Sequence, residues 1–268
     1  MSIFCDKLTN SYLCCSKKQY INVDNMCKKL IYKYYPCNTF SIESLMFGYL
    51  WFSKPSHLND PFDCNLSYVL NLPFCQAYTE DRQKIVETFD SFGVCCFSHD
   101  EVGEHFWSLY ANNYSGFRVA FDYNKLQKYL IRMGIIYESI DYQDTPIDIE
   151  KEMGNDPSDY IHRLDQVLRR CIFRKKANPW KVENEERFFM GLVPINNIED
   201  GKCLAIKEEK GYKVPFPLDC IKEIVVGHNI KDALLRQIKS IRRFRYPDVS
   251  MYQLEVNSKD WKLNKKEI

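Results

Sequence analysis

The chain has 268 residues, of which 45% are hydrophobic and 15% aromatic, enough apolar material for a sizeable core and too much for extended disorder. Its 37 basic and 36 acidic residues nearly balance, so overall charge gives no sign of non-specific binding to nucleic acid. No apolar run reaches the roughly 20 residues of a membrane-spanning helix, and we expect no membrane partner.

Residues 1–27 show no clear periodicity and are predicted to be an N-terminal extension. Residues 28–258 are predicted to form a single α+β domain, and residues 259–268 a charged C-terminal tail. Apolar runs bounded by Gly or Pro predict strands, and apolar side chains three or four residues apart predict helices. In chain order, the elements of the first half are strand 30–35, helix 39–47, strand 49–53, helix 80–92, strand 93–98, helix 101–110 and strand 116–122.

The second half of the predicted domain also mixes helices with strands. No β-α-β unit with a Gly-rich phosphate-binding turn is recognisable, which favours a central mixed or antiparallel sheet with flanking helices over a doubly wound sheet. The predicted elements are helix 124–133, strand 135–142, helix 157–176, strand 182–191, strand 202–206, strand 221–227, helix 231–244 and strand 250–256.

Twelve cysteines would indicate a disulfide framework in a small secreted domain. The first 15 residues, however, lack the apolar segment of a secretory signal, and the sequence has no C-x-x-C pair and five histidines. We therefore expect a cytoplasmic protein whose reduced cysteines pack as small apolar side chains, without a structural zinc site.

Several motifs together resemble a widespread bacterial family known as domain of unknown function 2971. The segments YKYYP (32–36), LWFSKP (50–55) and NDPFD (59–63) are similar to its opening motifs, and WKVENEER (180–187) to a later one. The resemblance spans about residues 30–256. Two positions depart from the family pattern, because Tyr35 stands where arginine is expected and Glu186 where tryptophan is expected.

The order of these motifs also resembles ADP-ribosyltransferase folds, which have a strand with a polar residue, a short helix, a strand ending in an aromatic residue and Ser, and a late strand bearing Glu. This resemblance implies an enzyme that uses NAD or a related nucleotide as substrate. It would transfer ADP-ribose to an unidentified acceptor or hydrolyse NAD, as a toxin or a phage-defence effector does.

Glu185 is the candidate catalytic residue, with Glu183 beside it. Cleavage of the nicotinamide–ribose bond builds positive charge on the ribose, as in glycoside hydrolysis, and a fixed carboxylate stabilises that charge. Strand alternation predicts that Glu183, Glu185 and Arg187 share one face. The alternative is the solvent face of an edge strand.

Six further residues are predicted to bind NAD, on the two N-terminal strands, the loop after them and the late strand. Each has a structural alternative: a lysine whose stem is buried, a core tyrosine, and Ser, Asn or Asp residues that stabilise a turn. The six residues are Lys33, Tyr35, Ser53, Asn59, Asp60 and Arg187.

Two other classes of protein stay open. A metal-dependent phosphodiesterase could bind magnesium through Asp60, Asp63, Glu183 and Glu185. A non-enzymatic module could instead contact nucleic acid or a protein through its basic helices, although a solvated helix face is the commoner reason for a basic run. One such run closes the last predicted helix with Arg236, Lys239, Arg242, Arg243 and Arg245.

Overall fold

The computed structural model describes residues 30–67, 89–101, 103–145, 174–190, 205–257 and 262–268, with the isolated positions 71, 83, 86, 87, 148, 151 and 259. The predicted N-terminal extension lies outside the described residues. Most of the predicted helix 157–176 and part of the predicted helix 80–92 lie outside them as well.

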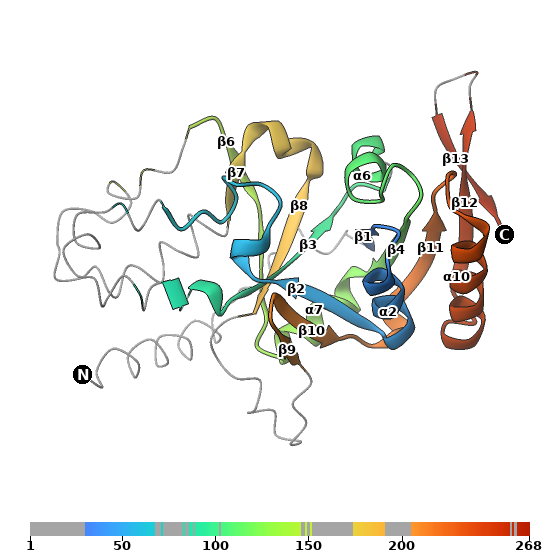
Figure 1. Ribbon diagram of the computed structural model, residues 1–268, viewed down its shortest axis with the longest axis horizontal. Helices are drawn as coiled ribbons and strands as arrows, with labels where there is room; N and C mark the ends of the chain where they lie inside the picture. Colours follow the sequence, from blue (N-terminus) through green and yellow to red (C-terminus); the bar gives the residue numbers. More distant parts are fainter. Residues whose placement is uncertain are drawn as a thin grey trace.

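Within the described residues, one mixed sheet of 11 strands organises the molecule. Its main path has the order β13-β12-β11-β4-β1-β3-β2-β10-β9 (Figure 1). Off this path, β8 pairs with β3, and β5 pairs with β8. The strands are β1 (Leu30–Tyr35), β2 (Tyr49–Ser53), β3 (Gly93–Ser98), β4 (Phe117–Asp122), β5 (Ile136–Ser139), β8 (Glu185–Met190), β9 (Ile206–Glu208), β10 (Gly211–Pro215), β11 (Ile221–Val226), β12 (Ser250–Asn257) and β13 (Lys262–Glu267).

Short helices and a small second sheet complete the described structure. The second sheet pairs two strands in parallel, β6 (Asp141–Gln143) and β7 (Lys175–Ala177). The α-helices are α2 (Thr39–Phe47), α6 (Glu104–Leu109), α7 (Tyr123–Arg132) and α10 (Asp232–Arg245), and the 3₁₀ helices are η2 (Pro55–His57), η5 (Asn178–Glu183) and η7 (Leu218–Cys220). This confirms the predicted α+β class with a mixed sheet and flanking helices.

Apolar side chains cover both faces of the sheet. Successive side chains of a strand point to opposite faces, so the central strands β1, β4 and β11 each contribute to two cores. On β4, Phe117, Val119 and Phe121 face the larger core, which also contains apolar side chains of α2, α7 and α10. Ala120 faces the smaller core with Phe106 of α6. The three longer helices therefore pack on one face, and α6 packs on the other.

Two helix starts follow the expected capping chemistry. The Asn38 side chain accepts a hydrogen bond from the Ser41 backbone N–H at the start of α2, and Asp122 accepts one from the Lys125 N–H at the start of α7. Gly48 ends α2 in the left-handed conformation, with φ of 72°, which favours glycine.

Several boundaries differ from the predictions. The predicted strand 135–142 is divided into β5 and β6 in the structure. The end of the predicted helix 157–176 is wrong, because Lys175 and Lys176 lie in the strand β7. β10 was not predicted, and β13 lies in the segment predicted as a charged tail. One β-α-β connection is present, because β11 and β12 pair in parallel and α10 lies between them in the chain. The turn that leads into α10, residues 227–231, is not a Gly-rich phosphate turn.

The sheet opens between β1 and β2. There β3 pairs with β1 through Tyr32–Ser98 and with β2 through Ser53–Val94, one residue pair at each end of the strand. All six residues of β3 pair with β8 instead. β3 therefore links two parts of the sheet while leaving space between β1 and β2. In the described part of the chain, no helix is long and apolar enough to cross a membrane.

Candidate active site

A cavity of about 200 Å³ lies at this opening of the sheet. Ligand pockets of drug size usually measure about 300–1,000 Å³, so the cavity accommodates part of a dinucleotide, such as one ring with its attached sugar, rather than the whole molecule. Its walls come from the ends of β1, β2 and β3, the loop after η2, α6, and the segments around β7 and β8. The lining residues are Tyr32, Lys33, Tyr34, Trp51, Ser53, Leu58, Asn59, Asp63, Val94, Cys96, Phe97, Ser98, Phe106, Tyr110, Lys176, Glu183 and Glu185.

One wall of the cavity is aromatic. The rings of Tyr34 and Phe106 stack with their centroids 4.8 Å apart, and Tyr110 lies 5.7 Å from Phe106. On another side, Lys33 Nζ donates to the Cys96 carbonyl at 3.0 Å and lies 5.3 Å from the centroid of the Phe97 ring. Aromatic faces of this kind bind planar rings and attract cations.

The opposite wall is charged. We call Asp63, Lys176, Glu183, Glu185 and Arg187 the charged cluster; none of these residues is more than 7% exposed. Burying charges is costly unless they are paired and hydrogen-bonded, and these side chains satisfy one another. With every member ionised, three carboxylates face two cations. The cluster therefore carries one net negative charge beside the cavity.

Glu185 is held at both carboxylate oxygens. Arg187 Nε donates to Oε1 at 2.6 Å, and Lys176 Nζ and Arg187 Nη2 donate to Oε2 at 3.0 and 3.1 Å. Burial alone would raise the pKa of Glu185, but Arg187 and then Lys176 outweigh it and hold the pKa at about 2. Glu185 is thus ionised at neutral pH. It can stabilise a cation, whereas it has no proton to donate as a general acid.

Glu183 contacts the same lysine from the end of η5. Tyr110 Oη donates to its Oε1 at 2.5 Å, and Lys176 Nζ donates to its Oε2 at 2.5 Å. Burial, and next the neighbouring Glu183 carboxylate, raise the pKa of Tyr110, so the phenol stays protonated and donates. Ser98 Oγ donates to the Glu183 carbonyl at 2.8 Å and anchors the backbone beside β3.

Arg187 is fully buried and does not line the cavity, and it holds two of the carboxylates of the charged cluster in place. Its Nη1 and Nη2 donate to Asp63 Oδ1 and Oδ2 at 2.8 and 2.5 Å, in addition to its bonds with Glu185. Burial would lower the pKa of Arg187, but Glu185 and Asp63 raise it well above its ordinary value. A bidentate pair of this geometry is among the stronger ionic contacts in proteins. Through Asp63, Arg187 also ties the loop that carries Asn59 to β8.

Five predicted site residues meet at the cavity although they come from distant parts of the sequence. These are Lys33, Ser53, Asn59, Glu183 and Glu185. The predicted arrangement of the two glutamates differs in one respect. Glu183 ends η5 and is not part of the strand, because β8 begins at Glu185.

Three predicted binding residues do not line the cavity. Tyr35 lies in the larger core, where its ring stacks on Phe117 at 4.9 Å, and burial raises its pKa. Asp60 stabilises the turn, because its Oδ1 accepts from the Phe62 N–H at 2.9 Å. Arg187 is fully buried and binds Asp63 and Glu185, so its role is to position the glutamate.

Lys176 and Tyr110 line the cavity but were not among the predicted site residues. Lys176 falls within the predicted helix 157–176, and its burial beside three carboxylates follows from the strand β7. Tyr110 directly follows α6, where aromatic residues at helical spacing indicate core packing. The short spacing between Lys176 and the glutamates was the one signal available, since a buried acidic pair needs a nearby cation.

The four carboxylates predicted as magnesium ligands of a phosphodiesterase are not gathered around one site for a metal ion. Asp63 and Glu185 bind Arg187, and Glu183 binds Lys176. Asp60 does not line the cavity. Among the described residues, no group of three or more His, Cys, Asp and Glu side chains is placed to hold a metal ion.

Comparisons of the chain with protein-family models, curated proteins and solved structures found no match in any of the three. The resemblances based on sequence motifs therefore stay predictions. The functional argument rests on the cavity, its aromatic wall and its charged cluster.

Proposed function

We propose that the protein is an NAD-using enzyme that cleaves the bond between nicotinamide and ribose. The observation that carries this proposal is the presence of the ionised Glu185, with Glu183, in the same small cavity as stacked aromatic rings. A buried carboxylate facing an aromatic cavity favours a ligand that is cationic, or becomes cationic during the reaction.

The nicotinamide ring of NAD has both properties that the cavity favours. It is planar and positively charged, and it can stack on Tyr34 or Phe106. The cavity volume of about 200 Å³ admits the ring and the adjoining ribose, while the remainder of the dinucleotide extends outside. Asn59 and Ser53 offer a side-chain amide and a hydroxyl to hydrogen-bond the carboxamide.

The charged cluster suits the bond-breaking step. Nicotinamide leaves with the bonding electrons, so the ribose becomes an oxocarbenium-like cation, which water or another nucleophile then attacks. The fixed negative charge of Glu185 stabilises that cation more than it stabilises the substrate, and this difference accelerates the reaction. Arg187 and Lys176 hold the carboxylate in place without neutralising the cluster.

The decisive variant is Glu185→Gln, which keeps the shape of the side chain and removes its charge. We expect kcat for nicotinamide release to fall by about 10²–10³-fold, as when one electrostatic group is lost from other active sites. Glu183→Gln is expected to impair turnover as well. The measurement is chromatography of free nicotinamide after incubation with NAD.

The matched control is Glu255→Gln, the same substitution at an exposed side chain that pairs with Lys266. It should leave turnover unchanged. Circular dichroism distinguishes a chemical defect from unfolding, and calorimetry with NAD reports binding separately. Wild-type-like turnover by a folded Glu185→Gln protein, or no binding of NAD to the wild-type protein, would rule the proposal out.

A further inference from the structure

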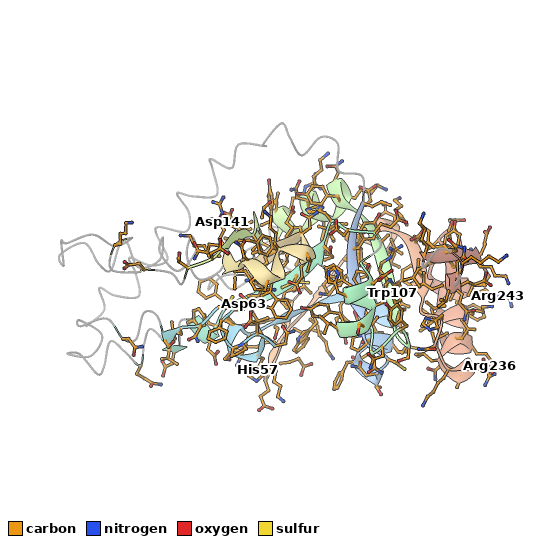
Figure 2. The ribbon with its side chains drawn as sticks, turned by 90° about the horizontal axis from the view of Figure 1, so that it is seen from above. His57, Asp63, Trp107, Asp141, Arg236 and Arg243 are labelled. Atoms are coloured by element: carbon orange, nitrogen blue, oxygen red, sulfur yellow. The ribbon has the colours of Figure 1, made fainter. Side chains whose placement is uncertain are left out.

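The outer face of α10 carries a stripe of basic side chains. Arg236, Lys239 and Arg243 are spaced three and four residues apart, which places them on one side of the helix, and all three are exposed. We call them the basic stripe. Leu234 and Ile238 on the opposite side are buried in the larger core, so the helix is anchored with the stripe facing outward. Figure 2 shows Arg236 and Arg243 at one end of the molecule, away from Asp63.

The positive charge of the stripe is not neutralised nearby. No ion pair among the described residues involves any of its three side chains. α10 has five basic residues against one acidic, whereas the whole chain has a net charge of only +1. Arg243 lies in the last turn, where a cation interacts favourably with the helix dipole, whereas like charges at this spacing repel one another, so Arg236 and Lys239 gain no such stabilisation.

The other two arginines of α10 have structural roles. Arg242 Nε donates to the Val249 carbonyl at 2.6 Å, and Arg245 Nη2 donates to the Phe47 carbonyl at 3.5 Å. These contacts satisfy backbone groups near the C-terminal end of the helix. The second contact also brings the end of α2 next to the end of α10.

One exposed aromatic ring lies beside the stripe. Phe244 is 80% exposed, and its ring centroid lies 5.8 Å from the Arg243 guanidinium carbon. Basic side chains that contact phosphates, next to aromatic rings on which bases stack, are the two components of surfaces that bind single-stranded nucleic acid.

We propose that the basic stripe, with Phe244, binds single-stranded nucleic acid. The stripe supplies phosphate contacts and the Phe244 ring supplies stacking, so binding depends little on sequence. An anionic membrane fits this surface less well. A helix that lies in a membrane buries its apolar face in lipid, and the apolar face of α10 is already buried in the protein core. The inference is independent of NAD chemistry.

The test is fluorescence anisotropy of a labelled oligouridine of about 20 nucleotides, titrated with the full chain without NAD between about 50 and 200 mM salt. The triple variant Arg236→Gln/Lys239→Gln/Arg243→Gln should bind at least tenfold more weakly at the lowest salt. The slope of log K against log salt should become shallower by about 2, since each lost contact to a single strand contributes about 0.7.

A matched control exists on α7. Lys125, Lys128 and Arg132 have the same spacing and are exposed, but Lys125 pairs with Asp219 at 2.7 Å. Their triple replacement by Gln makes the same change in net charge and should leave binding within about twofold of wild type. An equal loss in both triple variants would mean a diffuse charge effect and would overturn the proposed site.

Phe244→Ala tests the aromatic component. We expect about tenfold weaker binding with an unchanged salt slope, because stacking releases no counterions. Unaltered affinity of this variant, or tighter binding of a duplex than of oligouridine, would overturn the single-strand assignment. No binding of wild type at the lowest salt would overturn the proposal, as would stripe-dependent binding to phosphatidylserine vesicles without binding to oligouridine.

Discussion

Arg187 has no exposed surface, yet it sets the charge of the cavity wall through Glu185. Its guanidinium binds Glu185 and Asp63, which come from β8 and from the loop after η2. Lys176 adds a contact to each of these carboxylates and to Glu183. Because all five side chains are buried, removing one member leaves the opposite charges with fewer partners and without water to replace the lost contacts.

For Arg187→Met we expect a loss of about 3–5 kcal/mol in the free energy of unfolding, because two buried carboxylates lose one of their two cations and the hydrogen bonds that it donates. Urea denaturation followed by circular dichroism measures this change. The same replacement at exposed Arg236 should alter stability by no more than about 0.5 kcal/mol. Similar effects of the two substitutions would show that the cluster is not important for stability.

The charge of Glu185 also makes stability depend on pH. Its pKa in the folded state is about 2, below the ordinary value of 4.5, so the unfolded chain binds the proton more readily. The stabilising contribution is therefore present above about pH 5 and is lost as the pH falls toward 2. Urea unfolding across this range should show a smaller acid loss for Glu185→Gln. An identical pH profile for the variant would contradict the low pKa.

At the scale of single elements, the glutamate pair shows where sequence patterns stop being informative. All six residues of β8 are buried, so no alternation of polar and apolar positions marks its start. The true boundary is at Asn184, whose φ of 42° ends η5 and starts the strand. Asn adopts this left-handed conformation more readily than most residues, but an Asn between two glutamates does not by itself reveal it.

The conformation of Asn184 provides a test of how Glu183 is positioned. Asn184→Gly should keep the turn and differ little in stability, since glycine adopts positive φ without steric cost. Asn184→Val should cost about 1–2 kcal/mol and move Glu183 relative to Glu185. Thermal unfolding measures the change in stability, and the rate of nicotinamide release reports the displacement of Glu183. Equal stability of the two variants would contradict the left-handed geometry.

At the scale of the whole molecule, local patterns predicted most strands but not the order in which they pair. Strands β1, β2, β3, β4 and β11 have apolar runs with clear ends, and their prediction was confirmed. The sequence KLNKKE of β13 has one apolar residue, so only its pairing with β12 makes it a strand. The position of β3 between β1 and β2 depends on residues far apart in the chain, which no local pattern contains.

The strand β13 covers one edge of the sheet and presents lysines to solvent, a common means of preventing edge-to-edge association. Lys265 also reaches inward, to Glu101 at 2.5 Å and Glu223 at 2.8 Å. We expect that removal of residues 258–268 lowers stability and promotes aggregation through the uncovered edge of β12. Light scattering during storage measures aggregation, with Lys266→Gln as a control that keeps the strand. A truncated protein that stays monodisperse would contradict this role.

The single residue pairs that join β3 to β1 and to β2 have a mechanical consequence. Between β1 and β2 the boundary of the cavity consists of side chains, and the backbone ladder is continuous only on the β8 side of β3. The side chains of Lys33, Trp51 and Ser53, which line this seam, are half-buried, and their rotation does not require a backbone ladder to open. We therefore expect a small planar guest to pass the seam by side-chain rotation, while β3 keeps both halves of the sheet in register.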